Sequence, residues 1–248
     1  MKIEYLKRMD QIARKAGTRE PDDILDYMGC VFIDPGVSID GFVTRRKGII
    51  LYGVNQDITG KKYDFAVMHE GFHIVCGHLR LPGFLKGAAS THIDEFGSFA
   101  DYKWVASTER DADIGAADAI CDTQDVLDMM GYDSVDVAAY RKSLASFEQH
   151  ERDYRYHLGI VMRNGSPEKR ILRMKAFQCE LGRMYEELQE QANDIMNSGI
   201  CLSKTDIARE LGVPEYIVDY KMEALALRNY NVETVELPTF DKVFSRWN

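Results

Sequence analysis

A change in the spacing of apolar residues near residue 60 constrains the fold of this chain more than any other feature. Before it, the runs VFIDP, DGFVTRR and GIILYGVN are broken by Pro35-Gly36 and Lys47-Gly48, which predicts a meander of about three short antiparallel strands. From Tyr63 onward, apolar residues recur at helical spacing, beginning with a stripe from Phe65 to Val75. We therefore expect an α+β fold that is mainly helical, with a small three-stranded antiparallel sheet beside its first long helix.

The chain is predicted to contain three parts. Residues 1–135 hold two N-terminal helices, the sheet and the next long helices, and form one domain. Residues 136–200 predict an αα-hairpin, because Ser166 caps a long helix in which apolar residues recur every three or four positions. Residues 201–248 contain SKTDIARELGVPEYIVDYKMEALAL, which has the rhythm of a helix-turn-helix with Gly212 at the turn. We expect this last segment to pack on the first domain.

The charge of the chain disfavours direct contact with nucleic acid. Its formal net charge is −9, whereas a general nucleic-acid binder normally has a basic surface. In the helix-turn-helix-like segment, the second helix carries Glu215, Asp219 and Glu223 against Lys221. These carboxylates would face the phosphates of a bound duplex. Direct nucleic-acid binding is therefore not expected.

The cysteines and the N-terminus indicate the compartment. The five cysteines are scattered and never form a C-x-x-C pair, which favours a reducing interior over a disulfide framework. The opening MKIEYLKRMDQIARKAG lacks the continuous apolar core of a signal peptide, and no later stretch is long enough to span a bilayer. We expect a cytoplasmic protein without a membrane partner.

The stretch DFAVMHEGFHIVCGH contains candidate metal ligands and a candidate general base. His69 and His73 are four residues apart, so they project from the same side of a helix and can hold one zinc ion through neutral imidazole nitrogens. Glu70 points elsewhere and can reach the water on the metal instead. This division of roles suits a metallopeptidase, in which the metal polarises the carbonyl and the glutamate moves the proton.

A simpler interpretation is an amphipathic helix whose polar residues match the motif by accident. A five-residue pattern does not by itself separate the two interpretations. Three neighbouring features favour a site. Gly71 costs about 1 kcal/mol relative to alanine in mid-helix, a small meander directly precedes the helix, and a third ligand is available downstream.

That third ligand is predicted in STERDADIGAADAIC. Glu109 and Asp113 are four residues apart on a second helix, which we expect to open at Ser107 or Thr108. Glu109 would complete a His–His–Glu site with its fourth position left for water. Asp113 would accept a hydrogen bond from the far nitrogen of a ligand histidine. His78 lies about 140° round the helix from His73 and is expected to miss the metal. The alternative is that both acids belong to a solvated helix face.

The order of helix, strands, FAVMHEGFH and ERDADIGAADAI resembles that of the ImmA/IrrE metallopeptidases, gluzincin-like intracellular enzymes of bacteria and their mobile elements. The resemblance covers roughly residues 10–135. It implies zinc ligands at His69, His73 and Glu109, the general base at Glu70, and an acidic outer position at Asp113.

The chain departs from the pattern of that family in two places. Many members carry glycine before the second histidine, where this chain has Phe72. The interval between His73 and Glu109 is long, and its residues 79–105 could form a mobile flap over the cleft or supply a substitute ligand, His92 or Glu95.

The resemblance implies a zinc-dependent endopeptidase with a narrow protein substrate. Members of the family characteristically cleave or inactivate helix-turn-helix repressors and so induce mobile-element, prophage or stress genes. The hairpin at 136–200 would then offer a surface for docking a partner. The alternative is a non-catalytic protein, anti-repressor or antitoxin-like, that binds its partner and whose zinc is structural or absent.

Overall fold

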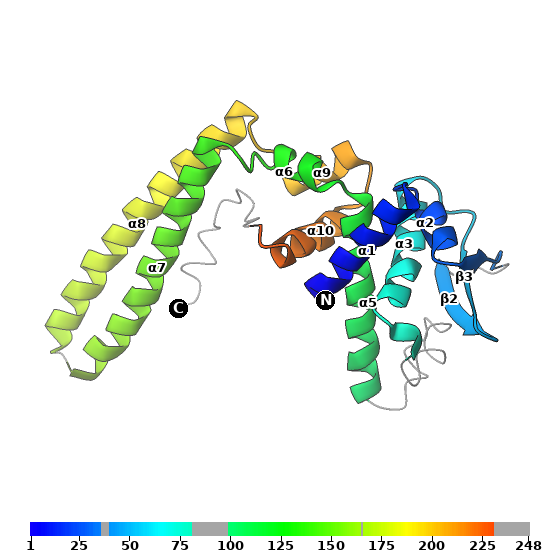
Figure 1. The fold of residues 1–248 in the computed structure, drawn as a ribbon. Coiled ribbons are helices and arrows are strands. Elements are labelled where there is room, and N and C mark those ends of the chain that lie inside the picture. Colours follow the sequence, from blue (N-terminus) through cyan, green and yellow to red (C-terminus); the bar gives the residue numbers. More distant parts are fainter. Residues whose placement is uncertain (36–39, 81–98, 165, 231–248) are drawn as a thin grey trace. The chain divides into compact units, whose positions relative to one another are not determined.

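The computed structural model describes residues 1–35, 40–80, 99–164 and 166–230. The chain forms two compact units, and Figure 1 shows their elements coloured along the sequence. In the described part of the chain, the first unit combines Met1–Asp125 with residues 204–230, and the second is Val126–Ser203. Each unit has its own cluster of buried apolar side chains. The observed fold is α+β and mainly helical, as predicted.

Two N-terminal helices, α1 (Ile3–Ala16) and α2 (Pro21–Tyr27), open the first unit. Pro21 occupies the first turn of α2, where its missing N–H needs no partner. The buried side chains of the two helices, Leu6, Met9, Ile24 and Leu25, join the core of the unit.

The sheet is mixed, so the predicted antiparallel meander is wrong in one pairing. Its strands are β1 (Cys30–Phe32), β2 (Gly41–Arg46) and β3 (Ile49–Val54), in the spatial order β1-β3-β2. β2 and β3 form the expected antiparallel pair across Lys47-Gly48, whose backbones both have positive φ. β1 instead pairs parallel to β3. The sequence pattern gives the length and the buried face of a strand, but it does not identify the neighbouring strand.

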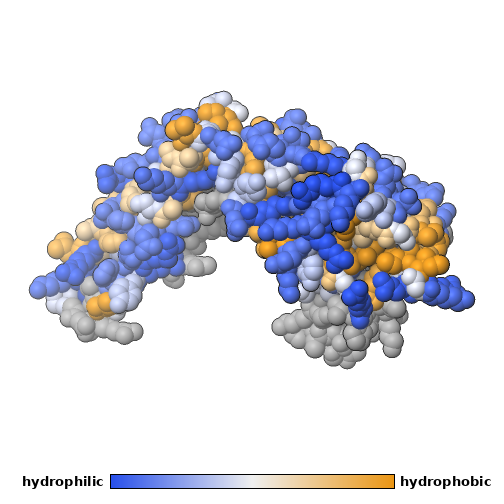
Figure 2. Space-filling view, in the orientation of Figure 1, coloured by the Kyte–Doolittle hydropathy of each residue, from blue (hydrophilic) through white to orange (hydrophobic). Residues whose placement is uncertain are grey.

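One face of this sheet meets α3 (Lys61–Val75), and the short η1 (His78–Arg80) follows that helix. Gly71 of α3 has a packing reason, because a Cβ there would lie 2.9 Å from Cδ1 of Leu25. The glycine therefore allows α2 to approach α3, and its cost in helix propensity is not in itself a sign of a functional site. Figure 2 shows apolar surface over the sheet, where Val31 and Ile49 are exposed.

The helix α5 (Phe99–Ile120) packs along α3. It begins before the predicted start, so Ser107 and Thr108 lie within it and do not cap it. The side chain of Phe72 fills the space over Gly115, since a Cβ on that glycine would lie 2.2 Å from the Phe72 ring. The phenylalanine that departs from the family pattern is thus accommodated by a glycine on the facing helix.

The C-terminal helices α9 (Lys204–Leu211) and α10 (Glu215–Leu227) belong to the first unit, and α10 packs on α5. Gly212 has a φ of +67° in the turn between them, a backbone conformation that favours glycine.

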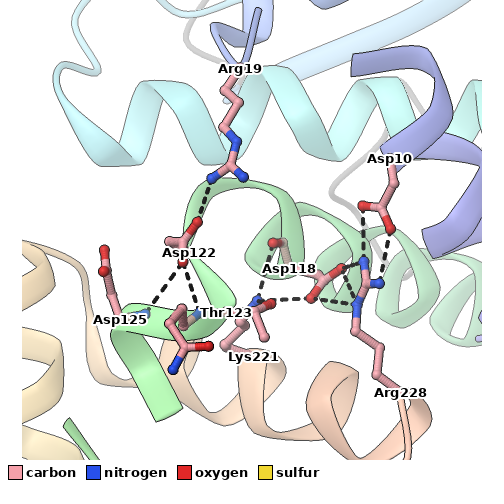
Figure 3. A network of polar contacts seen from close by, with 9 residues as sticks. Asp10, Arg19, Asp118, Asp122, Thr123, Asp125, Lys221 and Arg228 are labelled. Atoms are coloured by element: carbon pink, nitrogen blue, oxygen red, sulfur yellow. Dashed lines mark hydrogen bonds and ion pairs between the residues drawn. The ribbon is translucent and has the colours of Figure 1, made fainter. Parts of the chain in front are cut away.

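A buried polar network joins α10 to α5 and α1 (Figure 3). Lys221 is fully buried and donates hydrogen bonds of 2.9 Å to the Asp118 carboxylate and to the Thr123 hydroxyl. Arg228 bridges Asp118 and Asp10, with hydrogen bonds of 2.9 and 3.0 Å to the two carboxylate oxygens of Asp10. Because Lys221 points into the protein, it cannot contact a phosphate backbone.

The second unit contains most of α6 (Thr123–Met129) and the predicted hairpin, formed by α7 (Val135–Asn164) and α8 (Pro167–Ser198). α7 and α8 pack against each other through a single seam of buried side chains, whose members are Val137, Tyr140, Phe147, Tyr154, Leu181, Tyr185, Leu188, Ala192 and Ile195. Pro167 begins α8, and Ser166 accepts a 3.5 Å hydrogen bond from the Lys169 amide.

No helix within the described residues is both long and apolar enough to cross a membrane. All five cysteines are free, as their scattered placement predicts.

Candidate metal centre

Two facing helices bring the predicted site residues together. His69 and His73 lie one turn apart on α3, and Glu109 and Asp113 lie one turn apart on α5. The close packing of α3 on α5 turns these four side chains toward one another. His73 is buried, at 3% exposed, whereas the Glu109 side chain is 42% exposed and borders solvent.

Three donor atoms converge at the centre of this group. Nε2 of His69 lies 3.0 Å from Nε2 of His73 and 3.1 Å from Oε2 of Glu109. Nε2 of His73 lies 3.5 Å from the same oxygen. Across the described residues, this is the group of three His, Cys, Asp or Glu side chains whose geometry could hold a metal ion.

The spacing of the donors fits a tetrahedral zinc site. Zinc bonds of about 2.0–2.1 Å at tetrahedral angles put neighbouring ligand atoms about 3.4 Å apart. The three measured separations, 3.0, 3.1 and 3.5 Å, bracket that value. Two imidazoles and one carboxylate on one side leave a fourth position open, which is the arrangement of catalytic zinc sites.

The far nitrogens of both histidines are held by other side chains. Nδ1 of His69 lies 2.9 Å from Oδ1 of Asp113, to which it donates. Nδ1 of His73 lies 2.8 Å from Nδ1 of His78. With Nε2 of His73 turned to the donor group, Nδ1 carries the proton and donates to His78. Both contacts turn Nε2 of each ring toward the other donors, where a metal ion would take the place of a proton.

His78 thus has a place that the sequence did not predict. The helical projection predicts that it misses the metal. In the structure its Nδ1 contacts Nδ1 of His73, on the side of that ring away from the three donors. The chain leaves the regular helix after Val75, and Gly77, with a φ of +79°, precedes the short η1 helix that carries His78. A projection that continues α3 through residue 78 therefore gives the wrong direction for this side chain.

Burial and the two carboxylates set the charge of the cluster. Burial lowers the pKa of His69, but hydrogen bonds with Asp113 and Glu109 outweigh this effect and raise it to about 10. Burial lowers the pKa of His73. Burial raises the pKa of Glu109, yet its hydrogen bonds with both histidines leave it well below its usual value. A carboxylate held ionised beside two imidazole nitrogens is a donor set suited to a dication.

Glu70 stands apart from the three donors. Its side chain lies against β2, because a Cβ on Gly41 would be only 2.7 Å from Oε1 of Glu70. Glu70 is 7% exposed, and burial is the main reason that its pKa rises to about 7. Gly41 was not singled out from the sequence, where nothing relates a glycine at a strand start to a helix residue 29 positions later.

Aromatic side chains from α3 and α10 flank the centre. The Phe65 ring lies 6.3 Å from the His69 ring and 6.1 Å, edge to face, from the Tyr216 ring. Tyr220 is next to Tyr216, at 6.3 Å, and burial together with the charge of the nearby Asp113 raises the pKa of Tyr220 to about 12. The helix-turn-helix-like segment therefore lies beside the carboxylate that holds His69. The sequence gives no signal for this contact across more than 100 residues.

A separate cavity in the first unit is lined by none of the three donor residues. It has a volume of about 660 Å³ and is lined in part by the charged side chains Asp10, Arg14, Arg19, Asp118 and Arg228. Most of these groups are paired with one another. We place the candidate site at the three convergent donors because their geometry could hold a metal ion. The substitute ligands His92 and Glu95 and most of the 79–105 segment lie outside the described residues.

Comparisons with protein-family models, with curated proteins and with solved structures each find no match for this chain. The geometry of the donors is thus the main ground for inferring what this protein does.

Proposed function

We propose that this protein is a zinc-dependent endopeptidase. The observation that carries the proposal is the convergence of Nε2 of His69, Nε2 of His73 and an oxygen of Glu109 at separations of 3.0–3.5 Å, with Glu70 outside the group. A site that only stabilises the fold usually has four protein ligands, whereas a catalytic site has three and an open position.

The three donors would hold the metal and leave one side accessible through the partly exposed Glu109. Bound zinc would supply a Lewis acid that polarises a peptide carbonyl and lowers the pKa of the attacking water. The pairing of His69 with Asp113 and of His73 with His78 keeps both rings in place during this chemistry.

Glu70 is the proposed general base. It follows directly after a donor but turns toward β2, so its carboxylate is free of the donor group and can accept a proton from the water. It would then return that proton to the nitrogen of the leaving amine. Asp113 does not take this role, because its carboxylate already accepts a hydrogen bond from His69.

The resemblance to the ImmA/IrrE peptidases suggests the substrate class. We propose a narrow substrate in the cytoplasm, a helix-turn-helix repressor whose cleavage induces mobile-element, prophage or stress genes. The support is the match of HEGFH and ERDAD to the family's motifs together with the observed approach of His69, His73 and Glu109.

The test is the substitution Glu70→Gln, made in the full chain and co-expressed with a candidate repressor. The amide cannot accept the proton, so cleavage should fall by about 10²–10⁴-fold. Zinc content should remain at about one ion per chain, because Glu70 is not a donor. Repressor fragments by mass spectrometry, derepression of a reporter and zinc by elemental analysis are the three measurements.

The matched control is Glu223→Gln, an acid of α10 that is partly exposed and pairs with Arg110. It should cleave as the wild type does. Derepression by Glu70→Gln at the wild-type level, without cleavage, would show a sequestering binder and not a peptidase. Equal zinc in the wild type and in His69→Ala would rule out the metal centre itself.

A further inference from the structure

The hairpin of the second unit carries its charges in two separate regions. We call Arg155–Ile160 of α7 and Ser166–Lys175 of α8 the hairpin tip, which lies on either side of the turn between the two helices (Figure 1). The tip has five Lys or Arg against one Glu. The remaining described turns, 135–154 and 176–198, have four Lys or Arg against nine Asp or Glu. The hairpin is therefore basic at its tip and acidic toward its base.

Three basic side chains of the tip are available to an external partner, whereas Arg155 pairs with Glu151. The ion pairs on the rest of the hairpin use Arg152 with Glu148 and Arg183 with Glu187. Lys169, Arg173 and Lys175 form no ion pair within the described residues, and all three are exposed.

Large apolar side chains are exposed at the same end. The exposed fractions are 69% for Tyr156, 43% for Ile160, 56% for Ile171 and 72% for Leu172. Tyr156 and Ile160 lie four residues apart and share one face of α7. Figure 2 shows apolar residues among hydrophilic ones on the hairpin.

The buried seam does not use these side chains. Its last buried ring before the tip is that of Tyr154, which stacks on Phe177 with ring centroids 3.8 Å apart. No described side chain of the tip is buried. The core of the hairpin is therefore not stabilised by Tyr156, Ile160 or Leu172. Exposed apolar side chains that gather in one place mark an interaction surface.

We propose that the hairpin tip binds the surface of an anionic phospholipid bilayer. Lysine and arginine are attracted to anionic headgroups, while tyrosine, leucine and isoleucine enter the boundary between headgroups and acyl chains. Nucleic acid would use the basic groups but offers no apolar layer for Leu172 and Ile171. Since the base of the hairpin is acidic, an anionic surface attracts the tip and repels the rest of α7 and α8.

This contact differs from a membrane span, which no described helix can form. It departs from the sequence-based expectation that a membrane has no part in the function, and it does not depend on the proposed peptidase activity. The sequence pattern does not predict this membrane contact, because no single helix is both basic and apolar along its length. Only the hairpin turn brings the two short stretches together.

The experiment uses the purified full chain and co-sedimentation with two kinds of vesicle, phosphatidylcholine alone and phosphatidylcholine mixed with phosphatidylglycerol. The wild type should bind the anionic vesicles at least about tenfold more strongly. Lys169→Gln with Arg173→Gln and Lys175→Gln should abolish that difference. Tyr156→Ser with Leu172→Ser should lower the binding by about tenfold at unchanged charge.

Matched controls come from the base of the same hairpin. Lys142→Gln with Arg152→Gln and Arg183→Gln removes the same charge, and Val135→Ser removes a side chain that is 81% exposed. Both should bind as the wild type does. Circular dichroism checks the helices, and single substitutions at these exposed positions serve if a combined variant unfolds.

Equal binding of the wild type to both vesicles would overturn the proposal, and so would an equal loss in the controls. A DNA duplex provides the remaining comparison. If the glutamine variant loses the duplex while the serine variant binds duplex and vesicles like the wild type, the tip recognises a polyanion and not a bilayer.

Discussion

Asp113 holds the ring of His69 in its orientation, although Asp113 is not one of the three donors. Its Oδ1 accepts a hydrogen bond of 2.9 Å from Nδ1 of His69. Removal of such a partner typically lowers metal affinity by about 10–100-fold, because the ring loses its tautomer and its orientation. We therefore expect Asp113→Ala to bind zinc about 10–100-fold more weakly than the wild type.

Competition with a fluorescent zinc chelator measures this affinity. Asp57→Ala, in an exposed turn away from the site, is the control and should bind zinc normally. His78→Ala should also weaken zinc binding, since it removes the partner of the other histidine. Wild-type affinity in both Asp113→Ala and His78→Ala would mean that neither contact supports the centre.

At the scale of the elements, the packing of α3 on α5 depends on a glycine. Gly115 leaves room for the Phe72 ring, which a Cβ would approach to 2.2 Å. Overpacking of this kind typically costs about 1–3 kcal/mol. We expect Gly115→Ala to lower the free energy of unfolding of the first unit by that amount and to weaken zinc binding, because the same helix pair carries the donors.

Chemical denaturation followed by circular dichroism checks the change in stability. Gly182→Ala in α8, where a Cβ would meet nothing within 4 Å, is the matched control and should be neutral or stabilising by up to about 1 kcal/mol. Combining Phe72→Leu with Gly115→Ala should recover part of the loss. If Gly115→Ala is as stable as the wild type, the ring of Phe72 does not constrain the helix pair.

At the scale of the whole chain, a buried ion pair attaches the C-terminal helices to the N-terminal part of the first unit. Lys221 and Asp118 are almost fully buried and lie 2.9 Å apart, although they are 103 residues apart in the sequence. Removing one partner of such a pair leaves a buried charge and typically costs about 3–5 kcal/mol. Because Arg228 still pairs with Asp118, we expect Lys221→Met to cost about 3 kcal/mol, the lower end of that range, measured by chemical denaturation.

Lys204 and Asp219 provide a control of the same residue types and the same 2.9 Å distance, on the exposed side of α9 and α10. Exposed pairs contribute at most about 1 kcal/mol, so Lys204→Met should have a small effect. Similar losses for the two methionine variants would contradict a special role for the buried network.

The local part of this protein could be predicted from its sequence. Apolar periodicity identified the sheet region, the α3 stripe and the α7–α8 hairpin, because period and turn residues act over a few positions. The four-residue spacing of His69 and His73, and of Glu109 and Asp113, likewise put each pair on one helix face. The structure brings these two faces together.

The tertiary structure alone determined the contacts between segments that are distant in the sequence. It placed β1 parallel to β3, aimed Glu70 at Gly41, and brought Tyr220 close to Asp113. It also turned His78 back to His73 after the helix ended. Local spacing determines which way a side chain leaves its own element. Only the packing of whole elements, driven by burial of apolar surface, determines what that side chain meets.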